Sequence, residues 1–279
     1  MTSRIIQGLP TSFHESFFPD RRHLASVLKL ASHSFTGNLD DISAETGIPT
    51  GKSSGKVAPH LKYAHAMGMI KLPSLTDGSY ALQRTGLGQL FGSEDPLLHE
   101  PLTQLILHLM LSRPIGGAPA WHVLFGRSRL ALGRISTVDA IAKFLTNELG
   151  NSSALPGPIF ATYREEASLA RTGMLDMEKE VLTRGSLPSL PEYYWAYAYV
   201  WLTYWEQCAP TLQQMPLSEL EATCGFVEVS GWTDPSFDDF LAWATEQGIV
   251  RIDRQTGLPL IMKMRHSDEM VGQIYSDLL

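Results

Sequence analysis

The chain has 279 residues, of which 44% are hydrophobic and 18% charged, and its formal net charge is −7 at pH 7. These values exclude a disordered or fibrous protein and leave room for two or three small domains. Residues 1–92 hold nine Lys/Arg against six Asp/Glu, net +3, whereas the remainder holds thirteen against twenty-three, net −10. A local basic excess is typical of a region that contacts nucleic acid.

The sequence gives little support for a membrane protein, a disulfide-bonded protein or a metal-binding protein. The first eight residues lack the apolar stretch of a signal peptide. Cys208 and Cys224 are the only cysteines, too few for a disulfide framework or a zinc site. The aromatic run 193–205 is shorter than the about 20 residues that a bilayer requires. We therefore expect a cytoplasmic protein with no membrane span, metal or cofactor.

Residues 38–70 have the pattern of a helix-turn-helix. Asn38 can cap a first helix, which Gly47 would end in the left-handed conformation. Pro59 is tolerated only in the first turn of a helix, so a second helix should begin near Gly55 and run to the end of this segment. A motif of this kind places its second helix in the major groove of DNA.

A small wing is predicted after the second helix. Asp77-Gly78 is a strong tight-turn pair, so Lys71–Leu72 and Tyr80–Leu82 should pair as two strands, with Arg84 at their root. The new helix that follows begins within residues 82–91 and closes the module.

The groups expected to contact DNA lie on the second helix and the wing. Free backbone N–H groups and cationic side chains at a helix N-terminus bind phosphate, and the outer face of this helix is expected to include Tyr63. The residues predicted to contact DNA in this module are Lys52, Ser53, Ser54, Lys56, His60, Lys71 and Arg84.

The middle of the chain, residues 93–190, is predicted to be helical. Residues 97–112 form an apolar stretch typical of a buried helix. Further helices are expected after the sequence Ser136-Thr137-Val138-Asp139, which resembles a capping box, and over 159–169. A sparse group of arginines is either solvated surface or a weak nucleic-acid contact: Arg113, Arg127, Arg129 and Arg134.

Residues 191–279 repeat the first architecture. An aromatic helix over 192–208 should form core, a helix is expected to start at Asp234-Pro235, and residues 249–265 form a hairpin. A second winged helix is therefore predicted. Its wing supplies four further candidate DNA contacts: Arg251, Arg254, Lys263 and Arg265.

Two segments partly resemble catalytic motifs, but neither matches the pattern that the chemistry requires. Between Gly47 and Gly51 lie three residues where a phosphate-binding P-loop needs four. His14-Glu15 would open a zinc-protease motif, but position 18 is Phe18 rather than histidine. No Ser/His/Asp or paired-carboxylate pattern stands out, so we expect a protein without enzymatic activity.

Several short motifs, in this order, resemble the bacterial DUF4007 family: Phe13–Phe17, Gly47–Lys52, Thr85–Phe91, Asp95-Pro96, Phe160–Tyr163 and Tyr199–Glu206. The resemblance covers nearly the whole chain, although the turn over residues 49–55 looks longer than in the family. It implies an association with prokaryotic defence islands, often beside the sulfur-transfer genes of DNA phosphorothioation systems. The family has no assigned activity.

The sequence therefore predicts a mostly α protein in three parts: an N-terminal winged helix (1–92), a helical middle (93–190) and a C-terminal winged-helix-like domain (191–279). The predicted function is a non-enzymatic DNA-binding component of a prokaryotic anti-phage defence or DNA-modification system, with duplex DNA and proteins of the same system as partners. The alternative is a docking or adaptor subunit whose winged helices do not read DNA. Steep salt dependence of duplex binding would distinguish the first from the second.

Overall fold

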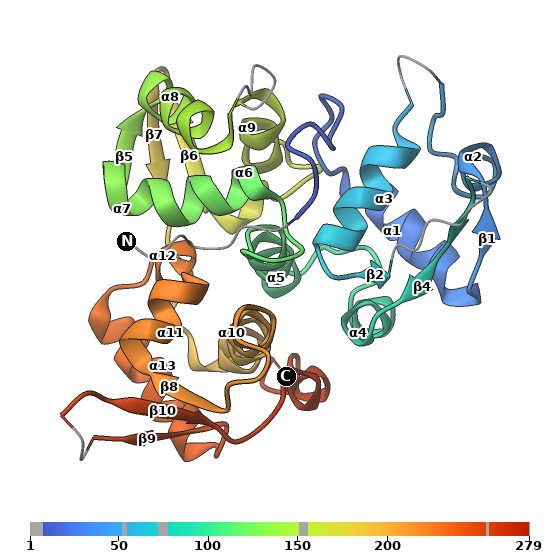
Figure 1. Cartoon of the computed structure of the whole chain (residues 1–279). Coiled ribbons are helices and arrows are strands. Elements are labelled where there is room, and N and C mark those ends of the chain that lie inside the picture. The colour runs from blue at the N-terminus through green and yellow to red at the C-terminus, as the bar shows by residue number, and fades with distance from the viewer. Residues whose placement is uncertain (1–7, 52–54, 72–77, 151–155, 255–256, 279) are drawn as a thin grey trace.

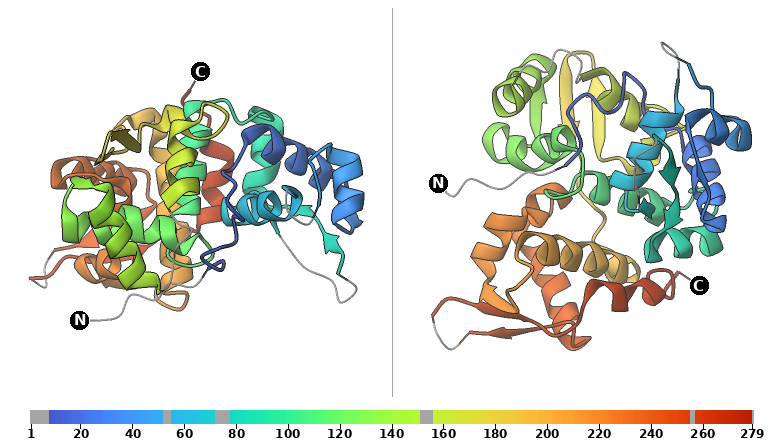
Figure 2. Two further views of the ribbon diagram at one scale, coloured as in Figure 1. Left: turned by 90° about the horizontal axis from the view of Figure 1, so that it is seen from above. Right: turned by 45° about the vertical axis from the view of Figure 1, so that its right-hand side comes forward.

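The computed structural model describes residues 8–51, 55–71, 78–150, 156–254 and 257–278. Three units of helices and short antiparallel sheets surround a buried central helix, α5 (Pro101–Leu111), as Figure 1 shows. The N-terminal unit projects to one side of the other two (Figure 2). The prediction of a mostly α protein is confirmed. Within the described ranges, no helix is both long and apolar enough to cross a membrane.

The N-terminal unit begins with α1 and ends with α4. Its elements are α1 (Arg21–Leu30), η1 (Ala31–His33), β1 (Thr36–Gly37), α2 (Leu39–Thr46), α3 (Val57–Ala66), β2 (Ile70–Lys71), β3 (Tyr80–Ala81), β4 (Gln83–Arg84) and α4 (Gly86–Glu94). β1 pairs with β3 and β2 with β4, all antiparallel. The segment that contains β3 and β4 therefore lies between the other two strands.

Several local signals in this unit act as the sequence predicts, but the second helix ends at Ala66 instead of residue 70, and the wing has a different register. Leu72 and Asp77 of the predicted wing lie outside the described residues. Asn38 accepts from the backbone N–H of Asp41 at 3.0 Å in a reciprocal capping box, and Gly47 ends α2 with φ 71°. The predicted pairing of Lys71 with residues 80–82 is wrong, because Lys71 pairs with Gln83 and residues 80–81 pair with β1. A Cβ at Gly88 would collide with the carbonyl of Met69, so only glycine lets α4 approach this closely.

The middle of the chain also contains a sheet, which corrects the prediction of a purely helical segment. After α5 come α6 (Pro119–His122), η2 (Val123–Arg127), α7 (Ser128–Leu132), β5 (Ile135–Thr137), α8 (Val138–Leu149), α9 (Pro156–Arg164), η3 (Ala170–Thr172), β6 (Leu175–Glu178) and β7 (Val181–Arg184). The strand order is β5-β7-β6. α8 begins close to the predicted capping box, but its cap is Thr137, one residue after Ser136, and the Thr137 hydroxyl accepts from the N–H of Ala140 at 3.1 Å.

The C-terminal unit has the predicted aromatic helix and hairpin. Its elements are η4 (Pro191–Tyr193), α10 (Tyr194–Cys208), β8 (Gln214–Pro216), α11 (Leu217–Cys224), α12 (Phe226–Ser230), α13 (Asp234–Glu246), β9 (Val250–Asp253), β10 (Leu260–Lys263) and η5 (Ser267–Gln273). The strand order is β8-β10-β9. α10 is core, as predicted, and Tyr204 on it donates to the carbonyl of Leu109 in α5 at 2.5 Å.

The middle and C-terminal units share one topology. Each has a helix, a strand, further helices and then two strands, and its last strand lies between the other two. The N-terminal unit has a similar order of helices, but its strands form two separate pairs, β1 with β3 and β2 with β4. The sequence predicted the two helices and the two following strands of the first and last units, but not the strands β1 and β8, and it missed the sheet of the middle unit. There the strands are only three to four residues long, and their polar and acidic residues give no clear alternation.

Candidate nucleic-acid interface

The segment over residues 9–20 covers α3, the helix expected to enter a DNA groove. Phe13 packs edge-on against Tyr63 at 4.8 Å between ring centroids, and the Tyr63 hydroxyl donates to the carbonyl of Phe17 at 3.0 Å. Seven of the ten residues of α3 are buried, by this segment on one side and by α1, α2 and α5 on others. The predicted outward position of Tyr63 is therefore wrong, and α3 has little free surface for reading bases.

His60 is also buried, which corrects its assignment as a DNA contact. Only 1% of the residue is exposed. Its Nε2 accepts from the backbone N–H of Asp20 at 3.1 Å, and its Nδ1 lies 2.7 Å from the carbonyl of Lys56. Burial lowers the pKa of His60 to about 4, so the ring is neutral near pH 7. It fastens the N-terminal segment to α3 instead of contacting a ligand.

The remaining predicted residues of this unit differ in position. Residues 52–54, which include Lys52, Ser53 and Ser54, lie outside the described part of the chain. Lys56 precedes α3 and is half-buried, with its Nζ 5.5 Å from the centre of the Phe17 ring. Lys71 is exposed on β2. Arg84 is half-buried at the root of the strands, as predicted.

The exposed side of α1 carries a polar and cationic stripe that the sequence analysis did not identify. Arg22, Ser26, Lys29 and His33 recur at helical spacing and are exposed or half-buried, while the residues between them pack inward. The helical spacing of these four residues is visible in the sequence. Arg22 pairs with Asp20 at 3.2 Å on the surface.

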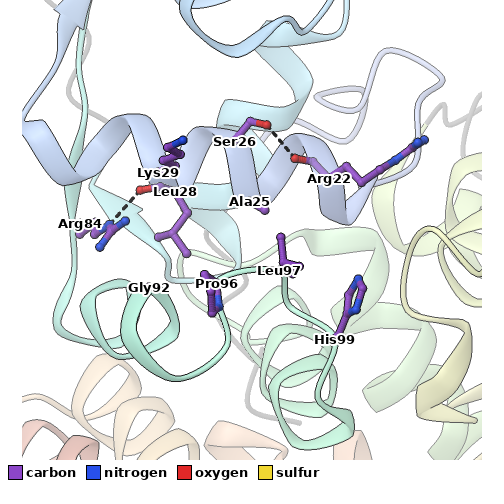
Figure 3. Close-up of a pocket in the computed structure, with 10 residues that line it drawn as sticks. All are labelled: Arg22, Ala25, Ser26, Leu28, Lys29, Arg84, Gly92, Pro96, Leu97 and His99. Atoms are coloured by element: carbon purple, nitrogen blue, oxygen red, sulfur yellow. Dashed lines mark hydrogen bonds between the residues drawn. The ribbon is translucent and has the colours of Figure 1, made fainter.

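A groove lies between α1 and the region from α4 to residue 99, and it is called the α1 groove below. It places further cations beside this stripe. Its volume is about 410 Å³, and it is lined by Arg22, Ala25, Ser26, Leu28, Lys29, Arg84, Gly92, Pro96, Leu97 and His99. No Asp or Glu is among these residues. Figure 3 shows Arg84 at one end of the groove, His99 toward the other, and apolar side chains between them.

The loop over residues 95–99 is firmly held where it borders the groove. The Asp95 carboxylate accepts from the backbone N–H groups of His99 at 2.9 Å and Glu100 at 2.8 Å. Leu98 is buried with φ 57°, a left-handed conformation that is costly for leucine. Leu97, beside it, is 61% exposed at the groove. The loop thus presents an apolar side chain to solvent from a rigid support.

The C-terminal wing has fewer available cations than predicted. Lys263 is buried, with its Nζ 3.7 Å from the Glu206 carboxylate and 5.8 Å from the centre of the Trp205 ring. Arg265 pairs with Glu269 at 3.2 Å. Lys263 is therefore buried against a carboxylate, and its prediction as a DNA contact is wrong. Arg265 is half-buried in a surface ion pair, and its contact with DNA stays a prediction. The exposed cations of this hairpin are two: Arg251 and Arg254.

The helix α13 occupies the place in the C-terminal unit that α3 occupies in the first. Its exposed residues include Asp234, Asp238, Asp239 and Glu246, and its sequence contains no lysine or arginine. Residues 191–279 as a whole hold four Lys/Arg against thirteen Asp/Glu, net −9. Such a face repels phosphate, so the second predicted winged helix has the wrong charge for DNA.

The arginines of the middle region hold the backbone together. Arg113 is buried and donates to carbonyls that include Ala66 at 2.7 Å and Ile115 at 2.8 Å. Arg127 pairs with Glu148 at 2.7 Å. The guanidinium groups of Arg129 and Arg134 donate to the backbone carbonyls of residues 185 and 184. These contacts favour the structural alternative for this group. In the described ranges, no three His, Cys, Asp or Glu side chains form a group that could hold a metal ion.

Comparisons with known proteins give a fold but no family. No model of a known protein family matches the chain, and no curated protein matches its sequence. A crystal structure of SspB has a TM-score of 0.70 at 16% identity, over 98% of this chain and 88% of that chain. A crystal structure of magnesium ion-bound SspB has a TM-score of 0.67 at 18% identity, with the same coverage. The chain thus shares the SspB fold, and the resemblance to the DUF4007 family stays a prediction.

Proposed function

We propose that the chain is a DNA-binding subunit of a prokaryotic anti-phage defence or DNA-modification complex, acting by binding and not by catalysis. The observation that carries the proposal is the α1 groove, which Arg22, Lys29 and Arg84 line with no acidic residue among the other lining residues. Cations gathered in this way favour phosphate. The biological setting rests on the resemblance to the DUF4007 family.

We further propose that the three units are winged-helix modules with different tasks. The similar order of their helices, and the strand order common to the middle and C-terminal units, support this interpretation. The N-terminal unit would contact the phosphates of duplex DNA through α1, Lys56 and Lys71. Base reading by α3 is not part of the proposal, because the segment over residues 9–20 covers that helix.

Charge reversal tests the N-terminal contact. The double variant Arg22→Glu/Lys29→Glu should weaken duplex binding by roughly tenfold or more at low salt, because two phosphate contacts become repulsive. Thermal unfolding should change little, since both side chains are exposed. Fluorescence anisotropy with a labelled duplex measures the affinity.

A matched control reverses two exposed cations of the C-terminal hairpin, Arg251→Glu/Arg254→Glu. The net charge changes by the same amount, so a general electrostatic effect would weaken both variants equally. We expect the control to retain most of its affinity. Equal losses in the two variants would remove α1 from the proposed interface.

A docking role is the second candidate function, and the acidic surface of α13 supports it. Asp238 and Asp239 lie exposed on a helix without any basic residue. In this proposal the C-terminal unit binds a basic surface of a protein from the same system, and DNA contact is secondary. An Asp238→Lys/Asp239→Lys variant would then lose the partner while its affinity for duplex DNA stays the same or rises.

A further inference from the structure

The α1 groove holds a recessed cation that lacks a counter-charge. The guanidinium of Arg84 is partly buried, and burial lowers its pKa because the charged form loses water. No carboxylate lines the groove. Within the described part of the chain, neither Nη atom of Arg84 has a hydrogen-bond acceptor. A bound anion would supply the negative charge that the Arg84 guanidinium lacks.

The position of this guanidinium is fixed. Its Nε donates to the carbonyl of Leu28 at 2.8 Å, a bond drawn in Figure 3. A Cβ at Gly92 would collide with the guanidinium, so the glycine allows the backbone of α4 to lie against it. Lys29 belongs to the same lining and has no ion pair among the described residues. Arg84 and Lys29 therefore supply two positive charges to the lining of the α1 groove, and Lys29 also lines a second hollow together with Glu45.

The rest of the groove is apolar and larger than a phosphate group. Ala25, Leu28, Pro96 and Leu97 line the part between Arg84 and His99 (Figure 3). A volume of about 410 Å³ lies within the range of small-molecule sites, on the order of 300–1,000 Å³. A ligand that suits this lining combines an anionic group with a flat or apolar body.

We propose that the α1 groove binds one nucleotide unit, with its phosphate on Arg84 and Lys29 and its sugar and base against Pro96 and Leu97. The base of an internal duplex nucleotide is stacked between its neighbours and cannot enter a groove of this kind. The nucleotide is therefore a free nucleoside 5′-monophosphate or the phosphorylated end of a DNA strand. Binding of a DNA end deepens the proposed function and rests on the DNA binding proposed above.

The test uses the full chain and four probes in direct binding measurements. These are deoxyadenosine 5′-monophosphate, deoxyadenosine, and one duplex sequence prepared with 5′-phosphate ends and as a covalently closed circle. We expect the monophosphate to bind and the nucleoside not to bind. The phosphorylated end should bind about tenfold more tightly than the circle, as expected for a pair of charge-assisted hydrogen bonds.

Two variants assign the effect to the groove. Arg84→Gln removes the charge, and Leu97→Asp places a carboxylate on an exposed side chain whose loss should not affect folding. Each should abolish binding of the monophosphate and the preference for ends. Leu97→Asp keeps the test valid if Arg84→Gln fails to fold. The control Leu258→Asp alters an equally exposed leucine, 63% exposed, in the C-terminal unit.

The outcomes separate this inference from the proposed function. If the circle binds as tightly as the phosphorylated duplex and the monophosphate does not bind, the inference is overturned while DNA binding stands. If the monophosphate binds through the groove and no duplex form does, the DNA-binding proposal fails and the ligand is a free nucleotide. Unchanged binding in both groove variants also overturns the inference.

Discussion

Replacing Trp201 by alanine is expected to lower the free energy of unfolding by about 3–5 kcal/mol, the range found for large aromatic side chains removed from a core. Trp201 is fully buried in α10. Its ring lies 5.5 Å from that of Phe240 between centroids, and its Nε1 donates to Glu221 at 3.0 Å. The variant loses both the packing and this hydrogen bond. Chemical denaturation followed by circular dichroism measures the change.

Trp195 provides the matched control, because it is half-buried on the same helix and packs against Trp243 at 4.9 Å between ring centroids. Trp195→Ala should cost less than Trp201→Ala. A loss below about 1 kcal/mol for Trp201→Ala would contradict the assignment of α10 to the core, since changes of that size are typical of surface sites.

Acid should destabilise the fold through two buried histidines. Burial lowers the pKa of His60 to about 4 and that of His108 to about 3, whereas an unfolded histidine titrates near about 6.5. Because the folded-state pKa values are depressed, the unfolded chain takes up protons first as the pH falls below 6.5. Stability is therefore fully present above that pH and decreases toward pH 4, by roughly 3 kcal/mol for His60 alone at about 1.4 kcal/mol per pKa unit.

Variants identify the responsible group. His60→Gln should make the dependence of unfolding free energy on pH shallower by up to about one proton between pH 6.5 and 4. His33→Gln changes an exposed histidine of the same unit and should leave the dependence unchanged. Parallel pH curves for wild type and His60→Gln would mean that His60 is not buried neutral in the folded state.

The elements of the fold were largely predictable where local chemistry decides them. Capping by Asn38, the helix end at Gly47 and the hairpin after α13 all follow from side chains within a few residues. The middle sheet was not predicted, because short strands such as β5 and β7 owe their pairing to tertiary packing.

The candidate site was predicted less well, because exposure depends on distant parts of the chain. His60 and Lys263 have polar side chains that look like surface groups in sequence. Their burial comes from the segment over residues 9–20 in one case and from Trp205 and Glu206 in the other. The α1 groove depends in the same way on Arg84 and residues 96–99 meeting α1. Only the spacing of the stripe on α1 was readable beforehand.

The salt dependence of duplex binding by the full chain tests the central claim most directly. Arg22 and Lys29 on α1, together with Lys56 and Lys71, would make four phosphate contacts. Each contact adds roughly 0.9 to the slope of log affinity against log salt concentration, so we expect a slope of about −3 to −4. The Arg22→Glu/Lys29→Glu variant should reduce that slope by about 2 units. Absence of duplex binding at low salt, or the same slope in wild type and variant, would contradict DNA contact by the N-terminal unit.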